Sequence, residues 1–249
     1  MIYFVGAGPG AVDLITVRGA EILRRADVII YAGSLVNPEL VKKYAGSECE
    51  IHDSSRMTLD EIADKLISAH ERGLVTVRLH SGDPALYGAI REQTAILRSR
   101  NIPFEIVPGV SSLFAASSAL KTEYMIPEHT QTLIISRIEG RTPAPENASV
   151  ALFLSAGMIE RSCSELIARG YAPETPAAVV YRASWPDEKV IRGTLETLPE
   201  LSRGITKTAI ILAGEFLNDD IKTTSRLYDK NFSHGYRRHS REGGVIVPE

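Results

Sequence analysis

The chain of 249 residues has little cysteine, no strong net charge and no long apolar run, and each absence narrows the class of protein. The two cysteines, Cys49 and Cys163, lack metal-like spacing, so we expect free thiols in a reducing cytoplasm. A formal net charge of −3 argues against nucleic acid and anionic membranes as partners. No apolar run reaches the roughly 18 residues that span a bilayer, and no basic segment precedes an apolar stretch at the start. We therefore expect neither a membrane span nor a signal peptide.

Glycine-rich turns are the main signal that the sequence does contain. Residues 6–10 read GAGPG, residues 80–84 read HSGDP and residues 108–109 read PG, and each turn follows an apolar run of strand length. Ligands of open α/β sheets bind outside the carboxyl ends of parallel strands. Three turns at one such edge predict a binding cleft.

The order of the patterns predicts an α/β protein with two α/β domains. Residues 1–120 alternate strand-length runs with helical patterns, which predicts a mainly parallel sheet. Residues 121–131 lack that rhythm and are predicted to be a linker. Residues 132–225 hold more strand candidates than helix candidates, which favours a mixed sheet, and residues 226–249 form a basic tail. The predicted strands are 2–5, 27–31, 74–79, 104–107, 132–135, 150–154, 177–181, 189–192 and 208–212, and the predicted helices include 17–26, 88–99, 111–120, 158–169 and 195–201.

One further helix carries explicit start and stop signals. Thr58 and Glu61 have the spacing of a capping box. Apolar residues then repeat at helical period through Ile67, and Gly73 stands where a glycine ends a helix. The sequence predicts a helix between these two signals.

Each turn also has a reading that needs no ligand. The first turn resembles a dinucleotide fingerprint, but Pro9 removes a backbone donor and no acidic residue follows Tyr31 to bind a ribose. Asp83 can accept hydrogen bonds from a ligand, or it can close its own loop as an Asx turn. His80, at a strand end, is typical of a satisfied structural histidine. Ser111 can simply cap the helix that follows it.

Arginines are the second chemical signal. Arg137 and Arg141 flank a glycine-containing turn, and Arg56 and Arg182 lie elsewhere in the chain. Most arginines of a soluble protein are solvated, but as a group they can bind carboxylates of a polyanion through forked contacts.

The motifs together resemble the tetrapyrrole (corrin/porphyrin) methyltransferase family nearly end to end. The likeness is closest to the branch that methylates C11 of precorrin-4 or cobalt-precorrin-4 in cobalamin biosynthesis. It rests on VGAGPG (5–10) with DLIT (13–16), RLHSGDPALYG (78–88), VPGVSS (107–112), TLIISR (132–137), GRTP (140–143), YRASWP (181–186) and FSHGYR (232–237).

The resemblance implies that S-adenosylmethionine is the methyl donor, bound in a cleft between the two domains of a cytoplasmic homodimer. It also implies an anionic tetrapyrrole substrate, no protein-bound metal, and no nucleic acid or membrane partner. The substrate arginines would be Arg137, Arg141 and Arg56. The implied cofactor contacts are Gly8, Pro9, Gly82, Asp83, Leu86, Ser111, Ser112, Ser155, Ala183 and Ala209.

Several alternatives stay open at this point. Another member of the superfamily would methylate a different ring carbon, a nicotinamide-dependent oxidoreductase would use the first glycine turn, and a binding module would have no activity. The catalytic residues are unknown, with His80, Glu123 and Glu128 candidates for a base by residue type only. The sequence also leaves open whether the substrate already holds cobalt.

Overall fold

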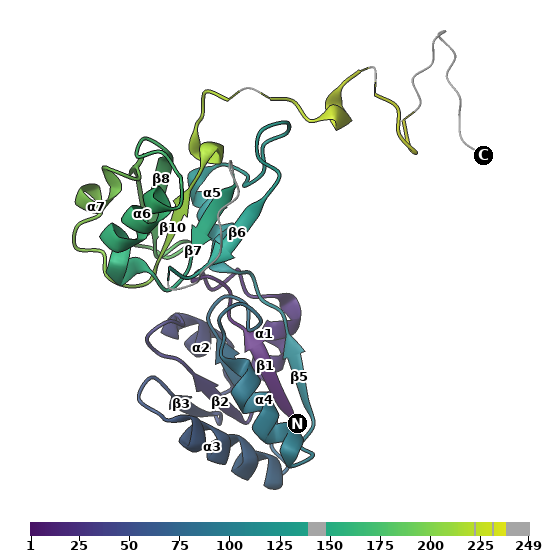
Figure 1. Ribbon diagram of the computed structural model, residues 1–249. Coiled ribbons are helices and arrows are strands. Elements are labelled where there is room, and N and C mark those ends of the chain that lie inside the picture. Colours follow the sequence, from purple (N-terminus) through teal and green to yellow (C-terminus); the bar gives the residue numbers. More distant parts are fainter. Residues whose placement is uncertain (139–147, 222, 231, 238–249) are drawn as a thin grey trace.

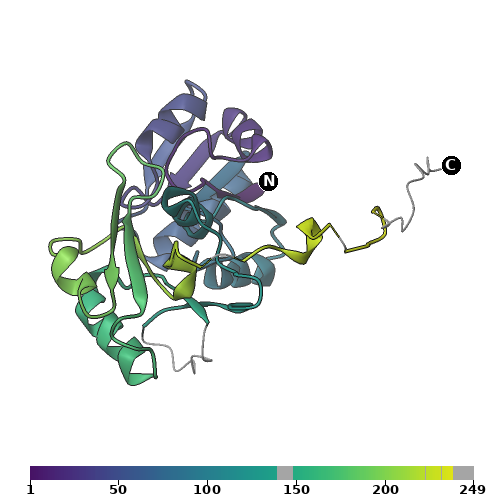
Figure 2. The ribbon, with the colours of Figure 1, turned by 90° about the horizontal axis from the view of Figure 1, so that it is seen from above.

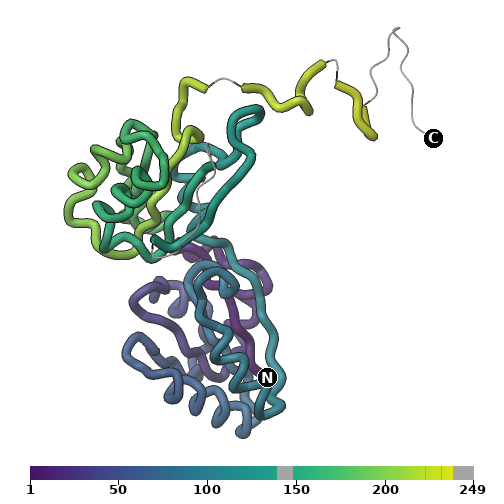
Figure 3. The backbone as a smooth tube through the Cα atoms, in the orientation of Figure 1, coloured from purple at the N-terminus to yellow at the C-terminus, as the bar shows by residue number. Residues whose placement is uncertain are grey.

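The computed structural model describes residues 1–138, 148–221, 223–230 and 232–237. Two α/β units follow each other along the chain, and each is built around one five-stranded sheet (Figure 1). The backbone passes from the first unit into the second after strand β5 (Phe104–Val107) (Figure 3). The predicted fold class is confirmed.

The first sheet is entirely parallel and has the strand order β3-β2-β4-β1-β5. All carboxyl ends of its strands therefore meet at one edge, as the alternation of strands and helices predicts. Its strands are β1 (Ile2–Gly6), β2 (Val28–Tyr31), β3 (Glu50–Asp53), β4 (Thr76–His80) and β5, and its helices are α1 (Val17–Arg24), α2 (Pro38–Tyr44), α3 (Leu59–Glu71) and α4 (Ile90–Ser99).

Helices cover both faces of this sheet, and side chains alternate between the two cores. Val77 and Leu79 of β4 pack with the α1 and α2 side chains, whereas Phe4 of β1 packs with those of α3 and α4. Because strand side chains alternate, Arg78 and His80 lie on the same face as Phe4, and the His80 ring stacks on the Phe4 ring at a centroid distance of 5.9 Å. Two ionisable side chains are thereby placed on a buried, largely apolar face of the sheet.

The second sheet is mixed, with the order β6-β7-β10-β8-β9. Only β6 and β7 pair in parallel, and the other neighbours are antiparallel. Its strands are β6 (Leu133–Ser136), β7 (Ser149–Leu152), β8 (Pro176–Tyr181), β9 (Lys189–Thr194) and β10 (Ala209–Ala213). The helical segments of this part of the chain are α5 (Ser112–Leu120), η1 (Ala156–Met158), α6 (Ile159–Ala168), α7 (Leu198–Leu201), η2 (Glu215–Leu217) and η3 (Arg226–Tyr228).

Helix α5 packs on the second sheet, although the sequence groups it with the first domain. Leu113 and Ala116 share a core with Val180 and Leu212. The backbone oxygen of Leu120, at the end of α5, also accepts a hydrogen bond from Arg192 at 2.9 Å. The domain limits 1–120 and 132–225 stay a proposal, and this packing favours moving the first boundary to the turn before α5.

Two elements of the first unit have no counterpart among the predicted elements. Strand β3 reads EIHD and lies at the sheet edge, where three of its four side chains are exposed. Helix α2 is only seven residues long and begins with an Asn37 cap and Pro38. An exposed edge strand and a two-turn helix need few apolar residues, so neither leaves a periodic pattern.

The tail extends away from both units (Figure 2). It holds η3 and a short turn closed by an antiparallel bridge between His234 and Arg237. Tyr228 and Tyr236 are exposed on it. Residues 238–249 of the predicted basic tail lie outside the described residues.

Candidate functional site

Three turns meet at the carboxyl edge of the first sheet, because β1, β4 and β5 are neighbours there. The backbones of Gly8 and Gly82 pair in both directions, with N–O distances of 3.3 and 2.8 Å. A Cβ on Gly6 would lie 2.6 Å from the Cα of Gly109, so no larger residue fits at that contact. Gly8 has φ +80 and Gly82 has φ +64, which glycine adopts without strain. The three predicted turns therefore form one surface.

Asp83 ties the second turn to the third. One of its carboxylate oxygens accepts from the backbone N–H of Ala85 at 2.8 Å, which is the Asx turn, and the other accepts from the N–H of Gly109 at 2.8 Å. Each oxygen keeps a second lone pair for a ligand. Asp83 thus has a structural role, and its proposed ligand contact would be additional.

A cavity of about 510 Å³ lies above these turns and is walled by both units. That volume falls in the range of small-molecule sites. Eight of the ten predicted cofactor residues line it, and their binding roles stay predictions. They are Pro9, Gly82, Asp83, Leu86, Ser111, Ser112, Ala183 and Ala209.

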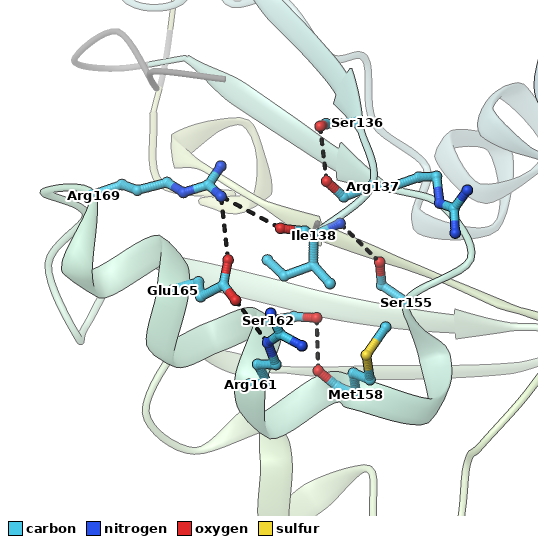
Figure 4. A network of polar contacts seen from close by, with 9 residues as sticks. All are labelled: Ser136, Arg137, Ile138, Ser155, Met158, Arg161, Ser162, Glu165 and Arg169. Carbon is cyan, nitrogen blue, oxygen red and sulfur yellow. Dashed lines mark hydrogen bonds and ion pairs between the residues drawn. The ribbon is translucent and has the colours of Figure 1, made fainter. Parts of the chain in front are cut away.

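Gly8 and Ser155 do not line the cavity. Gly8 lies beneath Pro9 in the backbone pairing with Gly82. The Ser155 hydroxyl is turned into the second unit, where it accepts from the N–H of Ile138 at 3.3 Å (Figure 4). It also donates to the Phe153 oxygen at 2.8 Å. The neighbours of Ser155 in the chain, Leu154 and Ala156, line the cavity instead.

Ser111 begins α5 and faces the same space. Its hydroxyl accepts from the N–H of Leu113 at 3.2 Å, so the predicted cap is confirmed. Ser112 follows at the first position of the helix. The positive end of the α5 dipole is thereby directed at the cavity.

A loop after β8 holds the first glycine turn against the second unit. The Trp185 indole N–H donates to the Pro9 oxygen at 3.0 Å, and the Ser184 hydroxyl accepts from the N–H of Ala11 at 3.0 Å. A Cβ on Gly10 would lie 2.1 Å from the Trp185 ring, so the ring and the turn are in direct contact. We call these contacts, made by Ser184 and Trp185 with residues 9–11, the Trp185 clasp.

Arg182 stands beside the clasp and lines the cavity. Its guanidinium lies 4.0 Å from the centroid of the Trp185 ring and pairs with Asp187 at 2.5 Å. Stacking on an aromatic ring and pairing with a carboxylate both fix the orientation of a guanidinium. The place of Arg182 at the cavity depends on the contact between the loop after β8 and the first glycine turn, so sequence spacing alone does not predict it.

Arg78 and His80 line the deep side of the cavity and are both 6 % exposed. Burial lowers the pKa of Arg78 to about 10, so its side chain remains charged at neutral pH. Burial, with a smaller effect of Arg78, lowers the pKa of His80 to about 3. A neutral ring that binds a proton only near pH 3 is a poor general base at neutral pH. Glu123 and Glu128, the other candidate bases, do not line this cavity.

Of the predicted substrate arginines, neither Arg137 nor Arg56 lines the cavity. Arg137 follows β6, and its charge opposes the rise in the pKa of Tyr87 that burial causes, so it lies near that cavity residue. Figure 4 shows the Arg137 side chain pointing away from the ion pairs of Glu165 with its neighbouring arginines. Arg56 lies close enough to Asp53 to affect the pKa of that carboxyl. Arg141 lies outside the described residues.

The described residues contain no helix long and apolar enough to cross a membrane. Within the same ranges, no group of three or more His, Cys, Asp or Glu side chains has the arrangement of a metal site.

Comparisons of the sequence with known proteins agree with one another. A family model described as Tetrapyrrole (Corrin/Porphyrin) Methylases matches residues 1–199. The cobalt-precorrin-4 C(11)-methyltransferase of Methanocaldococcus jannaschii is 49% identical over 97% of this chain and 97% of that protein. The precorrin-4 C(11)-methyltransferase of Pseudomonas aeruginosa is 42% identical over 95% of this chain and 98% of that protein.

Solved structures show the same likeness. The X-ray structure of a cobalt precorrin-4 methyltransferase, CbiF, superposes with a TM-score of 0.82 at 44% identity and covers 87% of this chain and 95% of that one. A uroporphyrin-III C-methyltransferase from Thermus thermophilus, complexed with S-adenosylhomocysteine, has a TM-score of 0.71 at 26% identity and covers 87% and 93%.

Proposed function

Because the chain belongs to the tetrapyrrole (corrin/porphyrin) methylase family, we propose that it transfers a methyl group from S-adenosylmethionine to C11 of precorrin-4 or cobalt-precorrin-4 in cobalamin biosynthesis. The observation that carries the proposal is the cavity between the units, which is lined by residues of the first two turns and by Ser111 and Ser112, just after the third. The relative at 49% identity and the structure at 44% identity both carry the cobalt name, so the cobalt form is the first substrate to test.

The cavity supplies what methyl transfer requires of a protein. The donor carries its own leaving group, so the enzyme mainly aligns the sulfonium with the attacking carbon, which can contribute several kcal/mol. The backbones of Pro9 and Gly82 approach the space closely, and apolar walls from Leu86, Ala183 and Ala209 exclude water from it. Among the lining residues described, Asp83 is the only carboxylate, and its two hydrogen bonds hold the turns in place.

The macrocycle would extend beyond this cavity, because 510 Å³ suits the donor alone. We propose that Arg137, Arg141 and Arg56 bind its acid arms at the rim. Arg137 lies next to Tyr87 at the lining, which supports the placement of the first of them. Guanidinium groups match the geometry of carboxylates.

We also propose that the protein is a cytoplasmic homodimer without a resident metal. Leu227, Tyr228 and Tyr236 expose apolar surface on the tail, which supports a partner subunit. Cys49 and Cys163 are free, which fits a reducing compartment. Sedimentation analysis of the purified chain tests the dimer.

One experiment tests the activity directly. The protein is incubated with methyl-labelled S-adenosylmethionine and, separately, precorrin-4 or its cobalt form, and the new methyl group is mapped on the ring by NMR. Label at C11 supports the proposal, and label at another carbon places the chain in a different branch of the family. Titration with NAD(H) beside S-adenosylhomocysteine tests the oxidoreductase alternative, which requires binding of the nicotinamide cofactor.

A further inference from the structure

The deep wall of the cavity holds a buried cation without a counter-ion. Arg78 is 6 % exposed and lines the cavity, yet none of the carboxylates described in the structure forms an ion pair with it. Burial alone accounts for its lowered pKa. A buried charge without a partner is costly, because the protein interior solvates it poorly.

Two of the three guanidinium nitrogens are held by the protein. Nε donates to the Gln93 side chain at 3.1 Å, and Nη1 donates to the Ile30 oxygen at 3.2 Å. Gln93 in turn donates to the Ala89 oxygen at 3.1 Å, which connects Arg78 to the lining loop after β4. Nη2 has no hydrogen-bond acceptor among the described residues, and protein atoms do not fully enclose it. The guanidinium is therefore fixed in orientation with one donor group left over.

His80 lies next to Arg78 on the same face of β4. Its Nε2 is buried and has no hydrogen-bond partner among the described residues. Because the ring is neutral at physiological pH, it adds no second charge. The pair thus presents one positive charge and one unused donor group, both on Arg78, beside a neutral His80 ring, and both residues are more than nine-tenths buried.

We propose that Arg78, with His80 beside it, forms a subsite for one carboxylate of a ligand bound in the cavity. The inference rests on the proposed function, since both ligands of that reaction carry carboxylates: the amino-acid end of the donor and the acid arms of the tetrapyrrole. A carboxylate would supply the missing counter-charge and accept from Nη2, and a desolvated pair of this kind contributes more than one at the surface.

The test compares wild-type protein with Arg78→Gln and Arg78→Lys. Arg91→Gln is the matched control, because Arg91 is an exposed arginine on α4 outside the cavity lining. Calorimetry measures the affinity for S-adenosylhomocysteine, for its decarboxylated analogue and for uroporphyrin III, a stable tetrapyrrole with eight carboxyl groups. Thermal unfolding without ligand verifies that each variant is folded.

The two possible sources of the carboxylate predict different changes in ligand affinity. If the donor supplies it, Arg78→Gln weakens S-adenosylhomocysteine binding by about tenfold or more and leaves the analogue unaffected. If an acid arm supplies it, only uroporphyrin III binding falls by about tenfold or more. In either case Arg78→Lys recovers part of the affinity because it keeps the charge. Arg91→Gln leaves the affinity for both ligands unchanged.

Two results would overturn the inference. If both ligands bind a folded Arg78→Gln variant with unchanged affinity, Arg78 does not form a carboxylate subsite, whereas the proposed function is not affected. Equal losses for S-adenosylhomocysteine and its decarboxylated analogue would show that Arg78 shapes the cavity rather than binding a carboxylate. Wild-type protein that binds neither ligand would instead overturn the proposed function, and the inference with it.

Discussion

Gly10→Ala tests whether the Trp185 clasp holds the donor cavity together. The added Cβ would lie 2.1 Å from Cδ1 and from Nε1 of Trp185, whereas carbon atoms in contact lie about 3.5–4.0 Å apart. The ring must therefore move by roughly 1.5 Å. That shift breaks its hydrogen bond to Pro9, because the bond is already 3.0 Å long.

The cost follows from these two contacts. The lost hydrogen bond removes about 1 kcal/mol, and overpacking at a well-packed contact adds about 1–3 kcal/mol. The sum of about 2–4 kcal/mol is a large fraction of the stability of a typical domain. Since Pro9 and Arg182 both line the cavity beside the clasp, we expect the affinity for S-adenosylhomocysteine to fall by about tenfold or more.

Trp185 is the only tryptophan of the chain, so its fluorescence reports on the clasp without a label. We expect a red-shifted emission in Gly10→Ala, measured beside calorimetric affinity and denaturant unfolding. Gly46→Ala is the matched control, because its Cβ would meet only the Arg24 oxygen, at 3.7 Å. In a Trp185→Ala background the Gly10→Ala change should cost less than about 0.5 kcal/mol, since the clash is gone. An equal cost in both backgrounds, or wild-type emission and affinity in Gly10→Ala, would refute the reasoning.

Four further outcomes are expected. Asp83→Ala removes the hydrogen bonds to Ala85 and Gly109 and should weaken S-adenosylhomocysteine binding by at least about 1.5 kcal/mol in calorimetry; unchanged affinity contradicts this. Arg137→Gln should raise the tetrapyrrole KM and leave donor affinity alone, and a loss of donor affinity would disprove the substrate role. Thr58→Ala should cost about 1 kcal/mol in denaturant unfolding by removing the cap of α3, and no change would discount the cap. Because the pKa of His80 is lowered to about 3 in the fold, the unfolded chain binds its proton first as pH falls below the ordinary value of 6.5, so stability drops between these values by up to about 1.4 kcal/mol per pH unit. Unfolding of His80→Leu across that range should show a correspondingly smaller drop, and an identical pH profile would rule His80 out as the cause.

Local patterns predicted much of the fold. The capping box forms as expected, with Glu61 Oε2 accepting from the N–H of Thr58 at 2.7 Å, and Gly73 ends α3 with φ +75. These features depend only on residues within one helix, so sequence spacing suffices to find them. Strand β3 was missed because an exposed edge strand carries no apolar alternation.

In the candidate site, too, sequence patterns predicted some features and missed others. The glycine turns follow strands that alternate with helices, and such an order places them at one sheet edge whatever the rest of the chain does. Three of the four predicted cofactor residues within those turns, Pro9, Gly82 and Asp83, accordingly line the cavity, whereas Gly8 lies beneath Pro9. Ser155 was carried over by position and lies outside the lining, since its hydroxyl is turned inward to Ile138 and Phe153, and its cofactor contact stays a prediction.

Sequence spacing predicts the α/β class, the three turns and their common edge, because parallel strands that alternate with helices end at the same edge of their sheet. Tertiary packing determines which groups meet across long sequence separations: Trp185 against Gly10, the Asp83 carboxylate on the N–H of Gly109, and a buried Arg78 that pairs with no carboxylate among the described residues. Such contacts depend on how the two sheets pack and on which hydrogen-bonding groups and charges find a partner in that packing. No local pattern of residues encodes these long-range features.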